Sequence, residues 1–100
     1  MAFTHIVMFT WREKDFDDAA VADALRALTS GLDGVQSYIC GHDIGVTPSA
    51  ADFAVVGSFD DREAFLRYRD HPEHQRILAE MILPNLEHRS VVQLEDPAAG

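Results

Sequence analysis

The sequence has little cysteine and no long apolar run. Its one cysteine, Cys40, cannot form a disulfide within the chain. A free thiol is typical of a reducing compartment, and the first residues lack the basic start and apolar core of a signal peptide. No apolar run approaches the about 20 residues that a membrane-spanning helix needs. These absences predict a cytoplasmic protein with no membrane span.

Positive charge is also scarce, which bears on the partners of the protein. Eight lysines and arginines stand against 17 aspartates and glutamates, a formal net charge of −9. Proteins that bind nucleic acid or an anionic membrane surface need a basic face, which this composition does not favour. We therefore expect neither nucleic acid nor a membrane as a partner.

Several signatures of cofactor and metal sites are missing. The chain has no glycine-rich phosphate loop and no G-x-S-x-G elbow, and residues 41–45 do not match the dinucleotide fingerprint. His5, His71 and His74 could be weighed as metal ligands. However, Pro72 separates the close pair and no carboxylate is clearly placed with them. The sequence predicts no metal and no external cofactor.

What is present is a strong hydrophobic pattern. Nearly half of the 100 residues are hydrophobic, which is enough for a single domain over residues 1–96, with a disordered tail over 97–100. Alternation and composition predict strands over 3–11, 35–45, 53–59 and 90–94. Spacings of three and four, with caps and breakers, predict helices over 18–30, 62–69 and 72–83. Acidic side chains at 15, 17 and 18 are expected to cap the first helix.

The order of these elements is strand, helix, strand, strand, helix, strand. It is the split βαβ pattern of a ferredoxin-like α+β sandwich with a four-stranded antiparallel sheet. Such a domain packs its helices on one sheet face and leaves the other open. The strand over 3–11 carries apolar side chains on both faces, so the open face needs cover. A twofold-related copy is the simplest cover, and we expect a homodimer.

His74 is the first candidate for chemistry. It shares a helix face with Ile77, Leu78 and Met81, so it should point toward the sheet. Burial and the positive end of the helix dipole both disfavour the imidazolium. A neutral imidazole able to accept a proton is the functional interpretation. A buried histidine with a satisfied hydrogen bond and no chemistry is the commoner alternative.

Tyr68 and His5 are placed near His74 by the same reasoning. Tyr68 follows Phe65 on the inner face of its helix, and its buried hydroxyl needs a partner. The break at Pro72 brings the two helix ends together, although an ordinary core tyrosine fits equally well. His5 joins this pair if its strand face meets the helices, and otherwise lies at the dimer interface.

Three segments resemble the stress-responsive α/β-barrel family, Dabb. They are His5-Ile6-Val7, Gly41-His42-Asp43, and Tyr68-x-x-His71-Pro72-x-His74-Gln75. The resemblance covers about residues 3–95 and implies a homodimeric barrel of two four-stranded sheets with the helices outside. Most members of this family have no assigned activity.

One plant enzyme of this family implies a chemistry. It closes a linear tetraketide by an aldol condensation, and its catalytic tyrosine and histidine map onto Tyr68 and His74. A pocket histidine of that enzyme maps onto His5. Another falls at Phe53, which makes the pocket expected here less polar.

Three hypotheses about function follow. In the first, the homodimer is a cofactor-free cyclase or isomerase for a small apolar or polyketide-like ligand, with His74 as base and Tyr68 as hydrogen-bond donor. The expected substrate-binding residues are His5, His71, Phe53, Phe3, Leu78 and Met81. In the second, a non-catalytic, stress-responsive dimer has a filled interior or binds a small apolar ligand. In the third, the protein is a cofactor-free monooxygenase, which Trp11 and the histidines permit.

Overall fold

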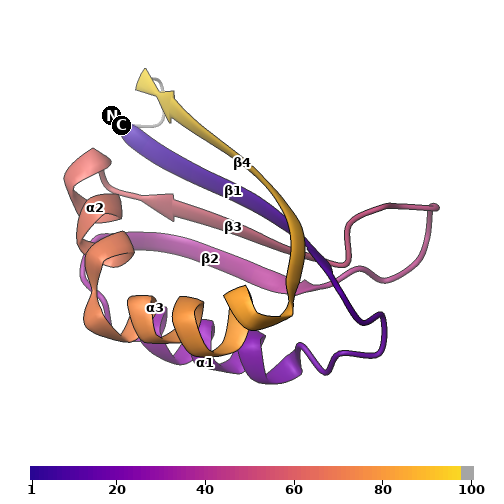
Figure 1. Cartoon of the computed structure of the whole chain (residues 1–100). Helices are drawn as coiled ribbons and strands as arrows, with labels where there is room; N and C mark the ends of the chain where they lie inside the picture. The colour runs from indigo at the N-terminus through magenta and orange to yellow at the C-terminus, as the bar shows by residue number, and fades with distance from the viewer. Residues whose placement is uncertain (98–100) are drawn as a thin grey trace.

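The structure, a computed structural model, describes residues 1–97 (Figure 1). In chain order its elements are β1 (Ala2–Trp11), α1 (Ala19–Ser30), β2 (Val35–His42), β3 (Phe53–Phe59), α2 (Arg62–Asp70), α3 (Pro72–Ile77), the π-helical turn η1 (Leu78–Ile82), the 3₁₀ turn η2 (Leu83–Asn85) and β4 (Leu86–Asp96). The strands form one antiparallel sheet in the order β2-β3-β1-β4. This order confirms the predicted ferredoxin-like α+β fold. Of the predicted tail, 97–100, the last three residues lie outside the described part of the chain.

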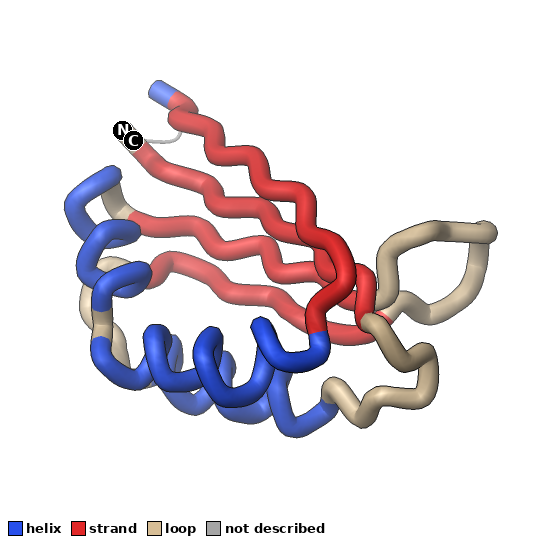
Figure 2. Tube along the Cα trace, in the orientation of Figure 1, coloured by secondary structure: helices blue, strands red, loops and turns tan. Residues whose placement is uncertain are grey.

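All the helices lie on one side of the sheet, as Figure 2 shows. Residues paired across an antiparallel ladder point to the same face, so the strand register defines which side chains meet the helices. His5 of β1 pairs with Gly57 of β3 and with Gln93 of β4. The helix-facing side chains of β1 are Phe3, His5, Val7, Phe9 and Trp11, and all but His5 are buried.

Two clusters of buried side chains fill the space between the sheet and the helices. The larger packs α1, α3 and η1 against the sheet, and its members include Trp11, Leu25, Phe53 and Ile77. The smaller packs α2 against the sheet, and its members include Phe3, Phe59, Phe65 and Tyr68. Each large apolar side chain buried in this way contributes about 1.5–3 kcal/mol to folding. The apolar helix faces predicted from the sequence are therefore the faces that pack.

A sharp break separates α2 from α3. His71 lies at the break in an extended conformation, with ψ 132°, because a residue that precedes proline avoids the helical region. Pro72 takes the first position of α3, and the His71 ring accepts a hydrogen bond from Glu73 N at 3.1 Å. The predicted break is confirmed, and the residue at the break caps α3. The helical segment expected over 72–83 extends to Asn85 and changes its winding on the way.

Two strands differ from the prediction. β2 stops at His42 rather than at 45, before a turn in which Gly45 has φ +76°. β4 covers Leu86–Asp96, whereas only 90–94 was expected. The polar residues 87–89 concealed its start. They are tolerated because β4 is an edge strand that pairs with β1 alone.

Asp18 and His42 have structural roles that the sequence did not reveal. Asp18 was among the acidic residues expected to cap α1. Instead the buried Asp18 carboxylate accepts hydrogen bonds from Trp11 Nε1 at 2.9 Å and from His42 Nδ1 at 2.6 Å. The hydrogen bond to Asp18 raises the pKa of His42. Asp18 occupies the N-cap position of α1 without a capping hydrogen bond from its side chain, and the neighbouring Asp17 carboxylate accepts a hydrogen bond from Ala19 N at 3.2 Å.

Replacing Asp18 with alanine should destabilise the fold by about 1–3 kcal/mol, because it leaves the fully buried Trp11 Nε1–H without a partner. The free energy of unfolding from urea titrations measures this effect. Asp17→Ala is the matched control and should cost about 1 kcal/mol or less, because Asp17 is exposed. Equal destabilisation by both variants would contradict a special role for Asp18.

The sheet face opposite the helices is apolar and is covered by no described residue. Ile39, Val56, Ile6 and Val92 form a row across all four strands on this face. Ile39 is 70% exposed and Val92 is 49% exposed. Monomeric proteins rarely expose an apolar face of this kind. Separately, no helix within residues 1–97 is long and apolar enough to cross a bilayer.

Candidate active site

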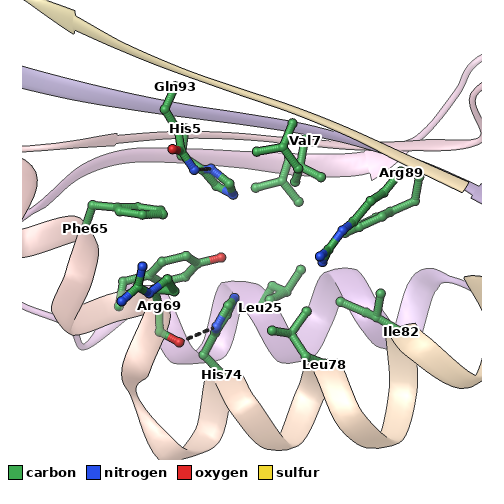
Figure 3. Close-up of a pocket in the computed structure, with 14 residues that line it drawn as sticks. His5, Val7, Leu25, Phe65, Arg69, His74, Leu78, Ile82, Arg89 and Gln93 are labelled. Carbon is green, nitrogen blue, oxygen red and sulfur yellow. Dashed lines mark hydrogen bonds between the residues drawn. The ribbon is translucent and has the colours of Figure 1, made fainter.

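A pocket lies between the sheet and the helical layer, beneath β1 and β4 (Figure 3). It exists because the helices pack mainly against β1, β2 and β3 and leave space beneath β4. Its volume is about 220 Å³. The sheet contributes His5, Val7, Phe9, Val55, Arg89, Val91 and Gln93, and the helices contribute Leu25, Phe65, Tyr68, Arg69, His74, Leu78 and Ile82.

His74 points from α3 into this pocket and is only 8% exposed. Its Nδ1 lies 2.9 Å from the Arg69 carbonyl oxygen. A carbonyl oxygen can only accept, so Nδ1 carries the hydrogen and the neutral ring has an unprotonated Nε2. Burial lowers the pKa of His74, although the carbonyl hydrogen bond opposes that shift. His74 therefore presents a proton acceptor to the cavity at neutral pH.

The helix break creates the hydrogen bond that orients His74. In an uninterrupted helix, the Arg69 carbonyl would accept from a backbone N–H one turn later. α2 ends at Asp70, so this carbonyl is free for side chains instead. It accepts from His74 Nδ1 and also from Gln75 Nε2 at 2.6 Å. The proline-induced break thus selects the ring tautomer of His74.

Tyr68 lies beside His74, with their ring centroids 4.3 Å apart. Its hydroxyl does not bond to the imidazole, as the sequence had suggested it could. It lies 2.7 Å from the hydroxyl of Tyr38 on β2, and either group can donate. Burial raises the pKa of Tyr68 to about 12 and also raises that of Tyr38. Both phenols are protonated at neutral pH. One hydroxyl hydrogen forms the hydrogen bond between the two tyrosines, and the other is left to donate elsewhere.

His5 faces the helices, which settles the alternative left open by the sequence. Its ring lies 4.9 Å from that of Phe65 and 6.5 Å from that of Tyr68. Gln93 Nε2 donates to His5 Nδ1 at 3.2 Å, so the hydrogen of the neutral ring is on Nε2. Burial, and then the charge of His74, lower the pKa of His5 to about 4. His5 therefore offers an N–H donor to the pocket that His74 enters as an acceptor.

Gly57 makes room for the tyrosine pair. Tyr38, Gly57, His5 and Gln93 form one row across the sheet on its helix-facing side. A Cβ at Gly57 would lie 3.2 Å from the Tyr38 ring and 3.0 Å from the Phe59 ring. The missing side chain lets Tyr38 lie close under the sheet and reach Tyr68. Sequence reasoning missed Tyr38, Gly57 and Gln93, because only the strand register brings them together.

Of the six predicted substrate-binding residues, His5 and Leu78 line the pocket and the other four lie elsewhere. His71 caps α3. Phe3 stacks on Phe65 at 4.6 Å and lies outside the lining. Phe53, on β3, is buried with its ring centroid 6.1 Å from that of Phe9 and is not among the lining residues.

Met81 misses the pocket because the helix changes its winding. The sequence interpretation assumed a regular α-helix, in which Met81 shares a face with His74. The π-helical turn η1 has wider turns, so residues four apart stay in line. His74, Leu78 and Ile82 consequently line the pocket, and Met81 packs against the larger core cluster.

Trp11 and Cys40 also lie outside the pocket lining. Trp11, weighed for a monooxygenase, is fully buried and held by Asp18. Cys40 is buried, and burial raises the pKa of its thiol, so the nucleophilic thiolate is disfavoured. Across residues 1–97, no group of three or more histidine, cysteine or acidic side chains is arranged to hold a metal ion.

The fold and the site together define a class of protein. A split βαβ domain with a pocket beneath one sheet face and an uncovered apolar opposite face is a ferredoxin-like domain of the α/β-barrel type. The chain belongs to the stress responsive A/B barrel domain family, Dabb, whose sequence model matches residues 3–96. This confirms the resemblance found in the sequence.

Several known proteins are similar to this chain. An uncharacterized protein of Streptomyces coelicolor is 33% identical in an alignment of 75 residues that covers 71% of this chain and 77% of that protein. A dimeric ferredoxin-like protein of unknown function from Thermobifida fusca is 35% identical, with a TM-score of 0.83 over 94% of this chain and 90% of that one. The hydroxynitrile lyase of Passiflora edulis is 18% identical, with a TM-score of 0.68 over 93% of this chain and 91% of that one. This last likeness shows the fold alone.

Proposed function

We propose that this protein is a cofactor-free enzyme that removes a proton next to a carbonyl group of a small ligand, as a cyclase or isomerase does. One observation carries the proposal. The Arg69 carbonyl fixes the tautomer of His74 that leaves an unprotonated Nε2 facing a cavity. A general base needs this state at neutral pH, together with access to its substrate.

The proposed step begins with a carbonyl compound bound between His74 and the sheet. His74 Nε2 takes a proton from the carbon next to the carbonyl, the electron pair of that C–H bond forms the C=C bond of the enolate, and the π pair of the carbonyl moves to its oxygen. His5 Nε2–H and the Tyr68 O–H are the available donors to the resulting enolate oxygen. In an isomerase the imidazolium returns the proton to another carbon. In a cyclase the enolate carbon attacks a second carbonyl, and the proton goes to the new alkoxide.

Tyr38 has a part in this step as a positioning residue. If Tyr38 donates to the Tyr68 oxygen, the hydrogen of Tyr68 is free for the ligand. The hydrogen bond received from Tyr38 also strengthens Tyr68 as a donor, because linked hydrogen bonds polarise one another. The pair can thus supply a strong donor while both phenols keep their protons.

The pocket limits the size of the ligand. Its volume of about 220 Å³ is below the about 300–1,000 Å³ of pockets that hold drug-sized molecules. The apolar part of its wall includes Val7, Val55 and Leu78. A short, partly apolar carbonyl compound fits these features better than a long polyketide. An open pocket also supports ligand binding over the filled interior of a purely structural dimer.

We also infer that the protein acts as a homodimer. The row Ile39, Val56, Ile6 and Val92 is an apolar face that water disfavours. The similar Thermobifida fusca protein is described as dimeric. A second copy packed on this face would join two sheets into the barrel implied by the family.

Proton exchange tests the proposed chemistry without knowledge of the natural substrate. The protein is incubated in D₂O with short ketones, oxo acids and lactones, and deuterium incorporation next to the carbonyl is followed by NMR. We expect incorporation above the buffer rate for at least one compound. The reaction needs no oxygen, so the same rate under nitrogen separates it from a monooxygenase. Binding without any incorporation would favour the non-catalytic dimer instead.

A further inference from the structure

The charge inside the pocket is opposite to that of the protein. The chain has a net charge of −9, yet the charged residues that line the pocket are Arg69 and Arg89, with no aspartate or glutamate among the lining residues. An acidic protein that places arginines around an apolar cavity creates a local positive field there. That field favours a ligand with negative charge.

Arg89 is the arginine whose charge is not already balanced. Arg69 forms a two-pronged ion pair with Asp70, at 2.9 and 3.2 Å. Within residues 1–97, by contrast, no hydrogen bond or ion pair holds the guanidinium of Arg89. Figure 3 shows this side chain reaching from β4 into the cavity, toward Leu78. Its five N–H donors are therefore free for a ligand.

The strand register places Arg89 at a defined distance from the proposed chemistry. Arg89 pairs with Phe9 of β1, whereas Gln93 pairs with His5. Four residues of a strand span about 13 Å, and the long arginine side chain covers part of that length. A short ligand held by Arg89 can therefore span the rest of this distance and bring a carbonyl toward His5 and His74.

We propose that Arg89 binds the carboxylate of the pocket ligand, so that the substrate is a short, apolar carbonyl acid. This inference rests on the proposed function of the same pocket. The planar guanidinium matches a carboxylate with two parallel hydrogen bonds. The lining residues Phe9, Leu78 and Ile82 provide an apolar surface for the rest of such a ligand. One free arginine suits the single charge of a carboxylate, and the chain has no phosphate-binding loop.

Levulinate and its neutral amide, levulinamide, form a matched pair of probes. Both are short carbonyl compounds of nearly equal size, and they differ in charge. We expect NMR titration of the wild-type protein to give a dissociation constant for levulinate that is at least about tenfold lower than the one for levulinamide. Arg89→Gln should abolish the preference, and Arg89→Lys should restore part of it. Arg67→Gln removes the same charge from an exposed site outside the pocket and should leave the preference unchanged.

The inference is overturned if levulinate and levulinamide bind equally, if neither binds, or if Arg89→Gln retains the preference. Thermal unfolding and gel filtration of each variant check that Arg89 does not act through folding or dimerisation. The exchange assay separates this inference from the proposed function. If His74→Gln lowers the exchange rate and Arg89→Gln does not, only the proposed carboxylate site is contradicted. If Arg89→Gln abolishes the preference for levulinate but the wild-type protein exchanges no compound, only the proposed catalytic function is contradicted.

Discussion

His74→Gln should lower the rate of deuterium exchange by about 10²- to 10⁴-fold, the usual contribution of a general base. Glutamine is a suitable replacement because its amide can still donate to the Arg69 carbonyl, so the helix break keeps its hydrogen bond. What the variant loses is the basic Nε2. The exchange rate of each candidate compound with the variant, relative to wild type, measures this loss.

His71→Gln is the matched control, three residues earlier in the chain. His71 caps α3 and does not line the pocket, so its replacement should cost about 1 kcal/mol of stability and change the exchange rate little. If His74→Gln retained the wild-type rate, or if the two variants lost activity equally, His74 would not be the base.

Val56→Glu should convert the dimer into a folded monomer. Val56 lies on a central strand in the middle of the apolar face and is 39% exposed in a single copy, so the monomer tolerates a polar group there. In the dimer, two unpaired carboxylates would be buried at the interface. Each such charge costs several kcal/mol, so the dissociation constant should rise at least about 100-fold. Light scattering after gel filtration at micromolar concentration measures the change.

Ala20→Glu provides the control for added charge, because Ala20 is exposed on α1, away from this face. It should remain dimeric. A monomeric wild-type protein would contradict the inferred dimer, and a dimeric Val56→Glu variant would show that the interface lies elsewhere.

Local patterns sufficed for much of the fold. The strand over 53–59 was predicted with its observed bounds, because its residues alternate between the core and the open face without interruption. The break between the helices was predicted because a single residue, Pro72, imposes it. The inward direction of His74 followed from helical spacing, and its burial confirms this.

The pocket was harder to predict because it depends on contacts between distant elements. Arg89 lies just before the strand predicted over 90–94 and Gln93 lies within it, but only pairing with β1 brings their side chains to the cavity. Tyr38 reaches Tyr68 only because Gly57 lies in the same row of the sheet. Neither relation has a signal in the local sequence.

Two residues predicted to bind substrate lie outside the pocket lining. Met81 was assigned to the pocket by regular helical spacing, which the π-helical turn η1 does not follow. Phe53 was assigned through the family resemblance, but the cavity lies mainly beneath β1 and β4, and its lining residue from β3 is Val55. A position matched by sequence alone therefore does not guarantee a place in the pocket.

The protonation state of His74 is the most direct test of the whole account, because it does not depend on the identity of the substrate. Nitrogen-15 NMR of the imidazoles measures which ring nitrogen carries the hydrogen and at which pH each ring titrates. Burial lowers the pKa of His74, so the ring should be half protonated only at a pH below 6.5, the ordinary pKa of histidine. The exchange activity should fall as the ring becomes protonated at acid pH. We predict that at pH 7 His74 is neutral, with its hydrogen on Nδ1. A hydrogen on Nε2, or an imidazolium at pH 7, would contradict the account.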